Sequence, residues 1–239
     1  MKKPWQKKEF WEKRLGKDWT DLLADTLKSK GLSNLMEIVT NEYSTGMTVP
    51  SRDLVFNAFQ ATPWKDLRVV ILGREPLRNG TANGLAYGMI NDDINDIKPV
   101  SYPLRKIEEC VDHIEKDEWK KSPLFFAYYD LAHWADQGVL LLNTALTARR
   151  ENHSAHLKLW APWTKKVLQA ITENSSGVIF CAWGKHAQSY ITDRMREFHH
   201  VLEFHEPMQS AFADEFWDCP HFEEINEILT RNNNQVIKW

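Results

Sequence analysis

Polar residues that could carry chemistry gather in segments that each follow a short apolar run. These segments span residues 73–80, 143–150, 184–188 and 203–211. They supply a carboxylate at Glu75, an amide at Asn143 and an imidazole at His205. A carboxylate and an imidazole can transfer protons or stabilise charge, and an amide presents a donor and an acceptor together. The pattern therefore indicates a binding or catalytic site.

The apolar runs predict the strands that would position these segments. They span residues 67–72, 139–142, 178–183 and 200–202. Short apolar runs of this kind are typical of strands that are buried on both faces of a parallel sheet. Helical patterns follow or separate them at residues 103–114, 125–134, 162–171, 186–198 and 221–229. We expect an α/β fold, a single three-layer α/β/α domain with a four-stranded, mainly parallel sheet, whose carboxyl edge holds the site.

The chain before the first strand is predicted to be helical. Apolar residues at helical spacing predict a helix over Lys17–Leu32, with Gly31 as its stop signal. A second helix is expected over residues 33–43, a loop over residues 46–50, and a short helix over residues 53–60. We expect residues 1–16 to form a basic N-terminal extension and residues 17–239 to form the domain.

Composition narrows the class of protein. The 239 residues are 43% hydrophobic and 26% charged, which is ordinary for a globular domain. No apolar run approaches the roughly 20 residues of a membrane-spanning helix, and no signal-peptide core is present, so we expect a cytoplasmic protein without a membrane partner. Cys110, Cys181 and Cys219 form no C-x-x-C pair, and His199 and His200 would point apart on a strand. We therefore expect no disulfide framework, no metal and no cofactor.

The net charge of −3 argues against coating of nucleic acid along the whole molecule. A net charge of −3 is still compatible with a local basic patch that binds nucleic acid. Candidate patches are the lysines up to Lys17, the pair Arg149–Arg150 and the pair Lys165–Lys166, each of which could equally be a solvated face.

One segment resembles a known family closely. Residues 138–147, which read GVLLLNTALT, are similar to the strand and loop GVLLLN-[TAS]-x-LT of the uracil-DNA glycosylases. Shorter matches follow the family's order at residues 53–59, 69–73, 84–87, 153–154, 183–188 and 219–222. The resemblance covers roughly residues 19–229. It implies an enzyme that needs no cofactor or metal, flips a nucleotide out of DNA and hydrolyses its N-glycosidic bond, with DNA as its partner. We also expect a monomer.

The same resemblance implies roles for two residues of the base pocket. Asn143 matches the asparagine that reads the edge of the pyrimidine, although its amide can be turned to suit uracil or cytosine. Tyr87 takes the place of the phenylalanine on which the flipped base stacks, and such stacking contributes about 1–3 kcal/mol. Core packing is the alternative role for Tyr87.

The water-activating motif GQDPYH of the family is altered here to GREPLR, residues 73–78. Glu75 replaces the catalytic aspartate and lies one methylene farther out, and a misplacement of about 1 Å can cost about 100-fold in rate. Leu77 replaces the tyrosine that excludes thymine, which would enlarge the pocket. Arg74 and Arg78 replace a glutamine and a histidine, and they add planar donors suited to phosphate or to a sugar-like substituent. Leu77 could instead only pack against a loop, and the arginines could be ordinary surface residues.

The second catalytic motif, HPSPLS, is altered further. Here it reads HEPMQS, residues 205–210. We match His205 to the histidine that stabilises the departing base, which places Gln209 at the wedge into the duplex and Ser210 at a phosphate contact. An ungapped match would place Glu206 at that histidine instead. Ser154, in the matched pair of residues 153–154, is a further candidate DNA contact, and Pro103 stands near an expected phosphate-binding serine.

These departures lead to one hypothesis with two alternatives. We expect a DNA glycosylase for a bulky 5-modified pyrimidine, such as those of some phage genomes, which would act as a defence and leave an abasic site. One alternative is uracil excision by a tolerant pocket. The other is a non-catalytic DNA-binding protein on the same fold.

Overall fold

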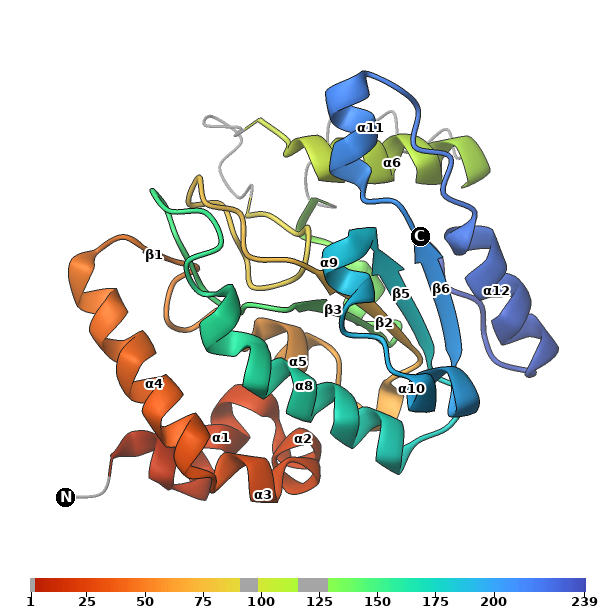
Figure 1. Ribbon diagram of the computed structural model, residues 1–239. Coiled ribbons are helices and arrows are strands. Elements are labelled where there is room, and N and C mark those ends of the chain that lie inside the picture. The colour runs from red at the N-terminus through yellow and green to blue at the C-terminus, as the bar shows by residue number, and fades with distance from the viewer. Residues whose placement is uncertain (1–2, 91–98, 116–128) are drawn as a thin grey trace.

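The computed structural model describes residues 3–90, 99–115 and 129–239 (Figure 1). Its helices are α1 (Lys8–Leu15), α2 (Lys17–Leu22), α3 (Ala24–Leu27), α4 (Lys30–Glu42), α5 (Asn57–Ala61), α6 (Tyr102–Glu115), α7 (Ala132–Ala135), α8 (Leu157–Asn174), α9 (Gly184–Gln188), α10 (Asp193–Phe198), α11 (Pro207–Ala213) and α12 (His221–Arg231). Its strands are β1 (Thr48–Val49), β2 (Val69–Gly73), β3 (Val139–Asn143), β4 (Ala148–Arg149), β5 (Ile179–Trp183) and β6 (His200–Phe204). Short 3₁₀ helices span Pro4–Gln6, Tyr43–Thr45 and Trp64–Asp66.

The central sheet confirms the predicted fold class. It is four-stranded in the order β3-β2-β5-β6, and each neighbouring pair is parallel. All residues of β2, β3 and β5 are buried, whereas β6 at the edge is half-buried. Each of the four predicted apolar runs forms one of these strands. Helices surround the sheet in the α/β/α arrangement (Figure 1).

The N-terminal helices differ from the prediction. The expected single helix over Lys17–Leu32 is divided into α2 and α3, and α4 has already begun at Lys30. Gly31 therefore lies inside a helix rather than ending one. The start of α4 is fixed by the hydroxyl of Ser29, which accepts a hydrogen bond from the backbone N–H of Leu32 at 3.2 Å. The prediction missed this N-cap.

Other elements keep their place but change their bounds. The helix expected over residues 186–198 is two helices, α9 and α10, because Thr192 caps the start of α10 through its hydroxyl. The expected loop over residues 46–50 contains β1, which pairs with β4. Helix α8 is longer than predicted and contains Pro162. Of the helix expected over residues 125–134, residues 125–128 lie outside the described residues, and the remainder contains the start of the short helix α7.

Aromatic side chains make up much of the core. Trp11 of α1 packs against Phe56 and Trp163, at ring-centroid distances of 5.5 and 6.3 Å. Trp11 is 2% exposed and Leu15 is fully buried, so residues of the expected N-terminal extension contribute to the same core as the sheet.

The three cysteines are free and buried. Burial raises the pKa of the Cys110 thiol to about 11 and raises the pKa of the thiols of Cys181 and Cys219 further. None of the helices in the described ranges has the length and apolar character needed to cross a bilayer.

Candidate functional site

The candidate site lies at the carboxyl edge of the central sheet. Gly73, the last residue of β2, pairs with Asn143, the last residue of β3. Trp183 at the end of β5 pairs with Phe204 at the end of β6. The polar segments that follow these strands therefore emerge side by side, as the sequence predicted.

Glu75 is held by the loop between β4 and α8. The backbone N–H of Ser154 donates to both carboxylate oxygens, at 3.2 and 3.0 Å, and Nδ1 of His153 lies 3.5 Å from Oε1. The Glu75 side chain is only 9% exposed. Ser154 supplies this N–H from a left-handed backbone conformation, with φ at +63°. A carboxylate fixed in this way can orient a water molecule or support positive charge on a sugar.

Both arginines of the altered motif reach toward the same loop. The guanidinium of Arg74 donates to the hydroxyl of Ser154 at 2.7 Å. Arg78 donates to the backbone carbonyl of Arg150 at 3.0 Å and contacts the ring of His153. The Arg74 side chain is exposed, so part of its fork faces solvent. Both arginines thus bind the same loop that holds Glu75, where their guanidinium groups could contact an anionic or hydroxyl-rich ligand.

The end of β2 comes unusually close to the amide of Asn143. A Cβ atom placed on Gly73 would lie 2.5 Å from Oδ1 of Asn143 and 2.7 Å from Cβ of Ala86. Any residue larger than glycine would push this amide away. Asn143 is 3% exposed.

Tyr87 lies near this edge in a left-handed conformation, with φ at +67°, and its ring centroid is 5.6 Å from that of Trp183. Burial raises the pKa of the Tyr87 phenol well above its usual range, and the charge of Glu206 raises it further. The phenol is therefore neutral at physiological pH.

Glu206 and His205 have different surroundings. A Cβ atom on Gly184 would lie 2.9 Å from Cβ and 3.4 Å from Oε2 of Glu206, so Glu206 lies against the start of α9. The ring of His205 packs on Phe204, with centroids 4.3 Å apart, and its Nε2 lies 3.1 Å from the hydroxyl of Ser210.

The two expected DNA contacts on α11 differ in their exposure to solvent. Gln209 is exposed, whereas Ser210 is 4% exposed and its hydroxyl is paired with His205. A phosphate contact by Ser210 would require that pair to open. Phe212 on the same helix is 83% exposed, and no sequence motif predicted this exposed aromatic ring. Leu77 is half-buried and packs against the core.

His186 is a further polar residue at this edge, and no role was predicted for it from the sequence. Its Nε2 lies 2.8 Å from the hydroxyl of Thr144, which in turn donates to the carbonyl of Arg74 at 2.8 Å. Because the Thr144 proton is used there, His186 donates to Thr144 through Nε2. Burial and the charge of Arg74 lower the pKa of His186, and Glu75 opposes this. Its place in the predicted segment 184–188 was the available signal.

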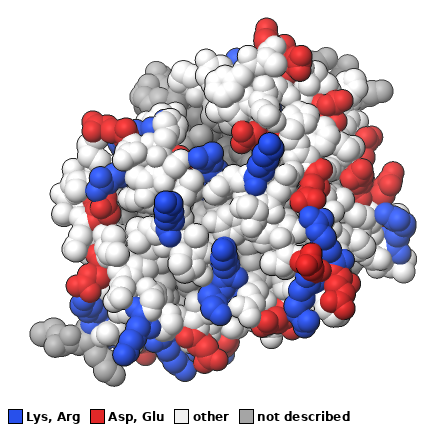
Figure 2. All heavy atoms as spheres, in the orientation of Figure 1, with Lys and Arg blue, Asp and Glu red and all other residues white. Residues whose placement is uncertain are grey.

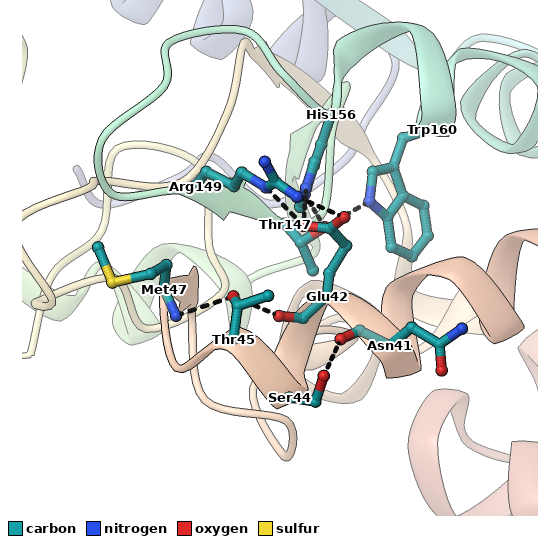
Figure 3. Close-up of polar contacts among 9 residues, drawn as sticks. All are labelled: Asn41, Glu42, Ser44, Thr45, Met47, Thr147, Arg149, His156 and Trp160. Carbon is teal, nitrogen blue, oxygen red and sulfur yellow. Dashed lines mark hydrogen bonds and ion pairs between the residues drawn. The ribbon is translucent and has the colours of Figure 1, made fainter.

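A polar network fixes the base of the loop that holds Glu75 (Figure 3). Arg149 donates two hydrogen bonds to the carboxylate of Glu42 on α4, at 2.5 and 2.7 Å, which lowers the pKa of that carboxyl. His156 lies 3.4 Å from Glu42 and 2.8 Å from the hydroxyl of Thr147, which also accepts from the indole N–H of Trp160 at 2.7 Å. The guanidinium of Arg149, a candidate for a basic patch, is therefore paired with Glu42 inside the protein.

Charge on the face shown in Figure 2 is uneven. Lys and Arg side chains are spread over its middle, in the region of α8 and α9, while Asp and Glu lie mainly toward its margins. Within the described ranges, no group of three or more His, Cys, Asp or Glu side chains is arranged to hold a metal ion.

Comparisons with known proteins agree on one family. Residues 59–236 match the model of the Uracil DNA glycosylase superfamily. A protein of Clostridioides difficile (strain 630) named uracil-DNA glycosylase is 32% identical over 228 residues, which cover 94% of this chain and 96% of that protein. A protein of the same name from Salmonella paratyphi B is 35% identical over 229 residues, which cover 92% of this chain and 93% of that protein.

Solved structures share the fold. The crystal structure of mimivirus uracil-DNA glycosylase superposes with a TM-score of 0.79 at 23% identity, covering 93% of this chain and 86% of that one. A UNG structure from Nitratifractor salsuginis superposes with a TM-score of 0.65 at 17% identity, covering 94% of this chain and 98% of that one.

Proposed function

The chain belongs to the uracil-DNA glycosylase superfamily and is a DNA glycosylase, and from this premise we propose that it excises a pyrimidine carrying a bulky substituent at C5. The product is DNA with an abasic site. A cell that meets phage with such modified DNA would use the enzyme as a defence.

The observation that carries this proposal is the combination of Glu75 and Leu77 in one short loop. The carboxylate of Glu75 is held in place by Ser154 and His153, so the group needed for hydrolysis is present and fixed. Two residues later, Leu77 replaces the aromatic ring with which the family closes the pocket beside C5. These two features support an enzyme that keeps a carboxylate for hydrolysis and accepts a larger base.

In the proposed mechanism the base leaves the helical stack and lies against Tyr87, where the amide of Asn143 hydrogen-bonds its edge. Glu75 orients the attacking water and supports the oxocarbenium-like sugar. His205 stabilises the departing base. Arg74 and Arg78 contact the substituent at C5. Gln209 inserts into the duplex, and Ser210 and Ser154 contact the DNA.

A panel of DNA substrates tests the proposal. The protein and its Glu75→Ala variant are incubated with duplexes containing uracil, thymine, 5-hydroxymethylcytosine or glucosylated 5-hydroxymethylcytosine, and alkali-sensitive abasic sites are quantified. We expect excision of at least one 5-substituted base, and a loss of about 100-fold or more in single-turnover rate for Glu75→Ala with DNA binding unchanged. Absence of excision on every substrate, with DNA binding intact, would contradict the glycosylase mechanism.

Uracil excision is the second candidate. The relatives named uracil-DNA glycosylase cover most of the chain, and Asn143 can present its amide to uracil as well as to cytosine. Excision of uracil alone from the same panel would favour this candidate and eliminate the bulky-base proposal.

A further inference from the structure

A cavity of about 640 Å³ lies among the N-terminal helices, away from the site described above. The 3₁₀ helix at Pro4–Gln6, α1, α2, α3 and the start of α4 form its walls. Figure 1 shows α1–α3 at the end of the molecule opposite α11, which follows the carboxyl edge of the sheet. A ligand in this cavity would therefore leave the DNA-facing edge free.

The rim of the cavity carries uncompensated positive charge. Lys7, Lys28 and Lys30 line it, and all three side chains are exposed. None of the three forms an ion pair with another residue that the structure describes. A fourth lysine, Lys8, is neutralised by Asp21 at 2.8 Å, and Asp21 is the one acidic residue in the described lining. In a chain whose net charge is −3, this rim is a local concentration of cations.

The floor of the cavity is apolar, and its two tryptophan rings are already in contact with other side chains. Trp11, Leu27 and the half-buried Trp5 contribute to it. The ring of Trp11 is enclosed by Phe10, perpendicular at 5.0 Å, and by Trp163, stacked at 6.3 Å. The ammonium of Lys3 lies 5.6 Å over the ring of Trp5. A nucleobase needs a free aromatic face, whereas an aliphatic side chain needs only an apolar hollow.

We propose that this cavity binds an acidic peptide segment of a partner protein. One large apolar side chain of the segment enters the hollow above Trp11 and Leu27. Neighbouring carboxylates pair with Lys7, Lys28 and Lys30 at the rim. The combination of an apolar anchor with a charged rim is how short segments obtain both affinity and specificity from a small pocket.

Peptide selection tests this directly. A phage-displayed library of random twelve-residue peptides is selected on the full-length chain, and the enriched peptides are synthesised with a fluorophore and titrated by anisotropy. We expect enriched peptides to carry several Asp or Glu residues around one Leu, Ile, Phe or Trp. Because the contacts at the rim are exposed ion pairs, their affinity should fall as salt rises.

Two variants locate the binding. The double charge reversal Lys28→Glu/Lys30→Glu should weaken binding at least tenfold. Ala24→Phe, which fills the cavity from its wall, should weaken it similarly without a change of charge. The control is Lys65→Glu/Lys238→Glu, which reverses two exposed lysines outside the cavity lining and should leave binding unchanged. Circular dichroism of each variant verifies that the fold is intact.

Several outcomes would overturn the proposal. They are the absence of enriched peptides, enrichment of peptides without acidic residues, and equal binding by the cavity variants and the control. A twelve-residue oligothymidylate is titrated in parallel. If the charge reversal abolishes binding of this oligonucleotide and leaves peptide binding unchanged, the rim is a nucleic-acid contact instead.

Discussion

Leu77 is the residue on which the choice of base depends in our proposal. We expect Leu77→Tyr to slow excision of a bulky 5-substituted base about 10- to 100-fold more than excision of uracil, because the ring would refill the space beside C5. Single-turnover rates on matched duplexes measure this selectivity. Leu77→Ile, which conserves volume, is the control and should change neither rate much. Equal losses on both substrates for Leu77→Tyr would show that this position does not gate the pocket.

The two candidates for the leaving-base position can be separated by charge. Because the departing base becomes anionic, the nearby carboxylate of Glu206 opposes its departure. Glu206→Gln is therefore expected to raise the excision rate about tenfold, or by roughly 1.4 kcal/mol of barrier, and His205→Ala to lower it about 10- to 100-fold.

The measurement is the single-turnover rate of each variant on the same duplex. A large loss in Glu206→Gln combined with an unchanged rate in His205→Ala would reverse the assignment and make Glu206, in its protonated form, the group that stabilises the base.

Helix α4 and strand β4 are joined through Glu42, and this junction lies at the base of the loop that holds Glu75. Glu42→Gln removes the charge that Arg149 and His156 share (Figure 3). We expect it to lower the free energy of unfolding by about 1–3 kcal/mol and to slow excision as the loop loosens. Denaturant unfolding and single-turnover rates measure the two effects. Glu151→Gln, an exposed change in the same loop, is the matched control.

The strands were easier to predict from the sequence than the helix boundaries. Continuous apolar runs located β2, β3 and β5, because a strand buried on both faces leaves a local signal. A shorter run located β6, which is only half-buried. The start of α4 was missed because it depends on one hydroxyl, that of Ser29, and Gly31 was interpreted as a stop. The separation of α9 from α10 at Thr192 was missed for a similar reason.

The site was predictable in its location but less so in its contacts. Parallel strands bring their carboxyl ends together, so the segments containing Glu75, Asn143 and His186 were expected at one edge. The pairing of Glu75 with Ser154 depends on the path of a loop 79 residues away, which no local pattern encodes. The burial of Ser210 likewise follows from tertiary packing.

The stability of the whole molecule should depend on pH through its buried histidines. The ring of His221 accepts a hydrogen bond from the indole N–H of Trp183 at 3.0 Å, and burial lowers its pKa to about 4. Burial also lowers the pKa of His199 and His186. A histidine with a lowered pKa in the folded state binds fewer protons there than in the unfolded chain. The contribution of such a histidine to the free energy of unfolding is therefore fully present above about pH 6.5, and it is lost as the pH falls toward 4.

For His221 alone, this difference predicts a loss of about 2 kcal/mol in the free energy of unfolding between pH 7 and pH 5. Urea denaturation at constant ionic strength measures it. In a His221→Gln variant, which cannot gain the proton, the decline should be smaller by that amount. A wild-type stability that is flat over this interval would contradict the prediction.

Because its three thiols are buried, we expect the native protein to react only slowly with thiol-directed labels. A cysteine reacts as its thiolate, and burial with a raised pKa suppresses that form at Cys110, Cys181 and Cys219. Maleimide dyes should therefore attach to a cysteine introduced on the surface while the natural thiols stay unmodified. Donor and acceptor dyes on the protein and on DNA could then report docking at the sheet edge in real time, without the removal of any native cysteine. Slow reaction at the natural thiols would, in the same experiment, report transient opening of the core.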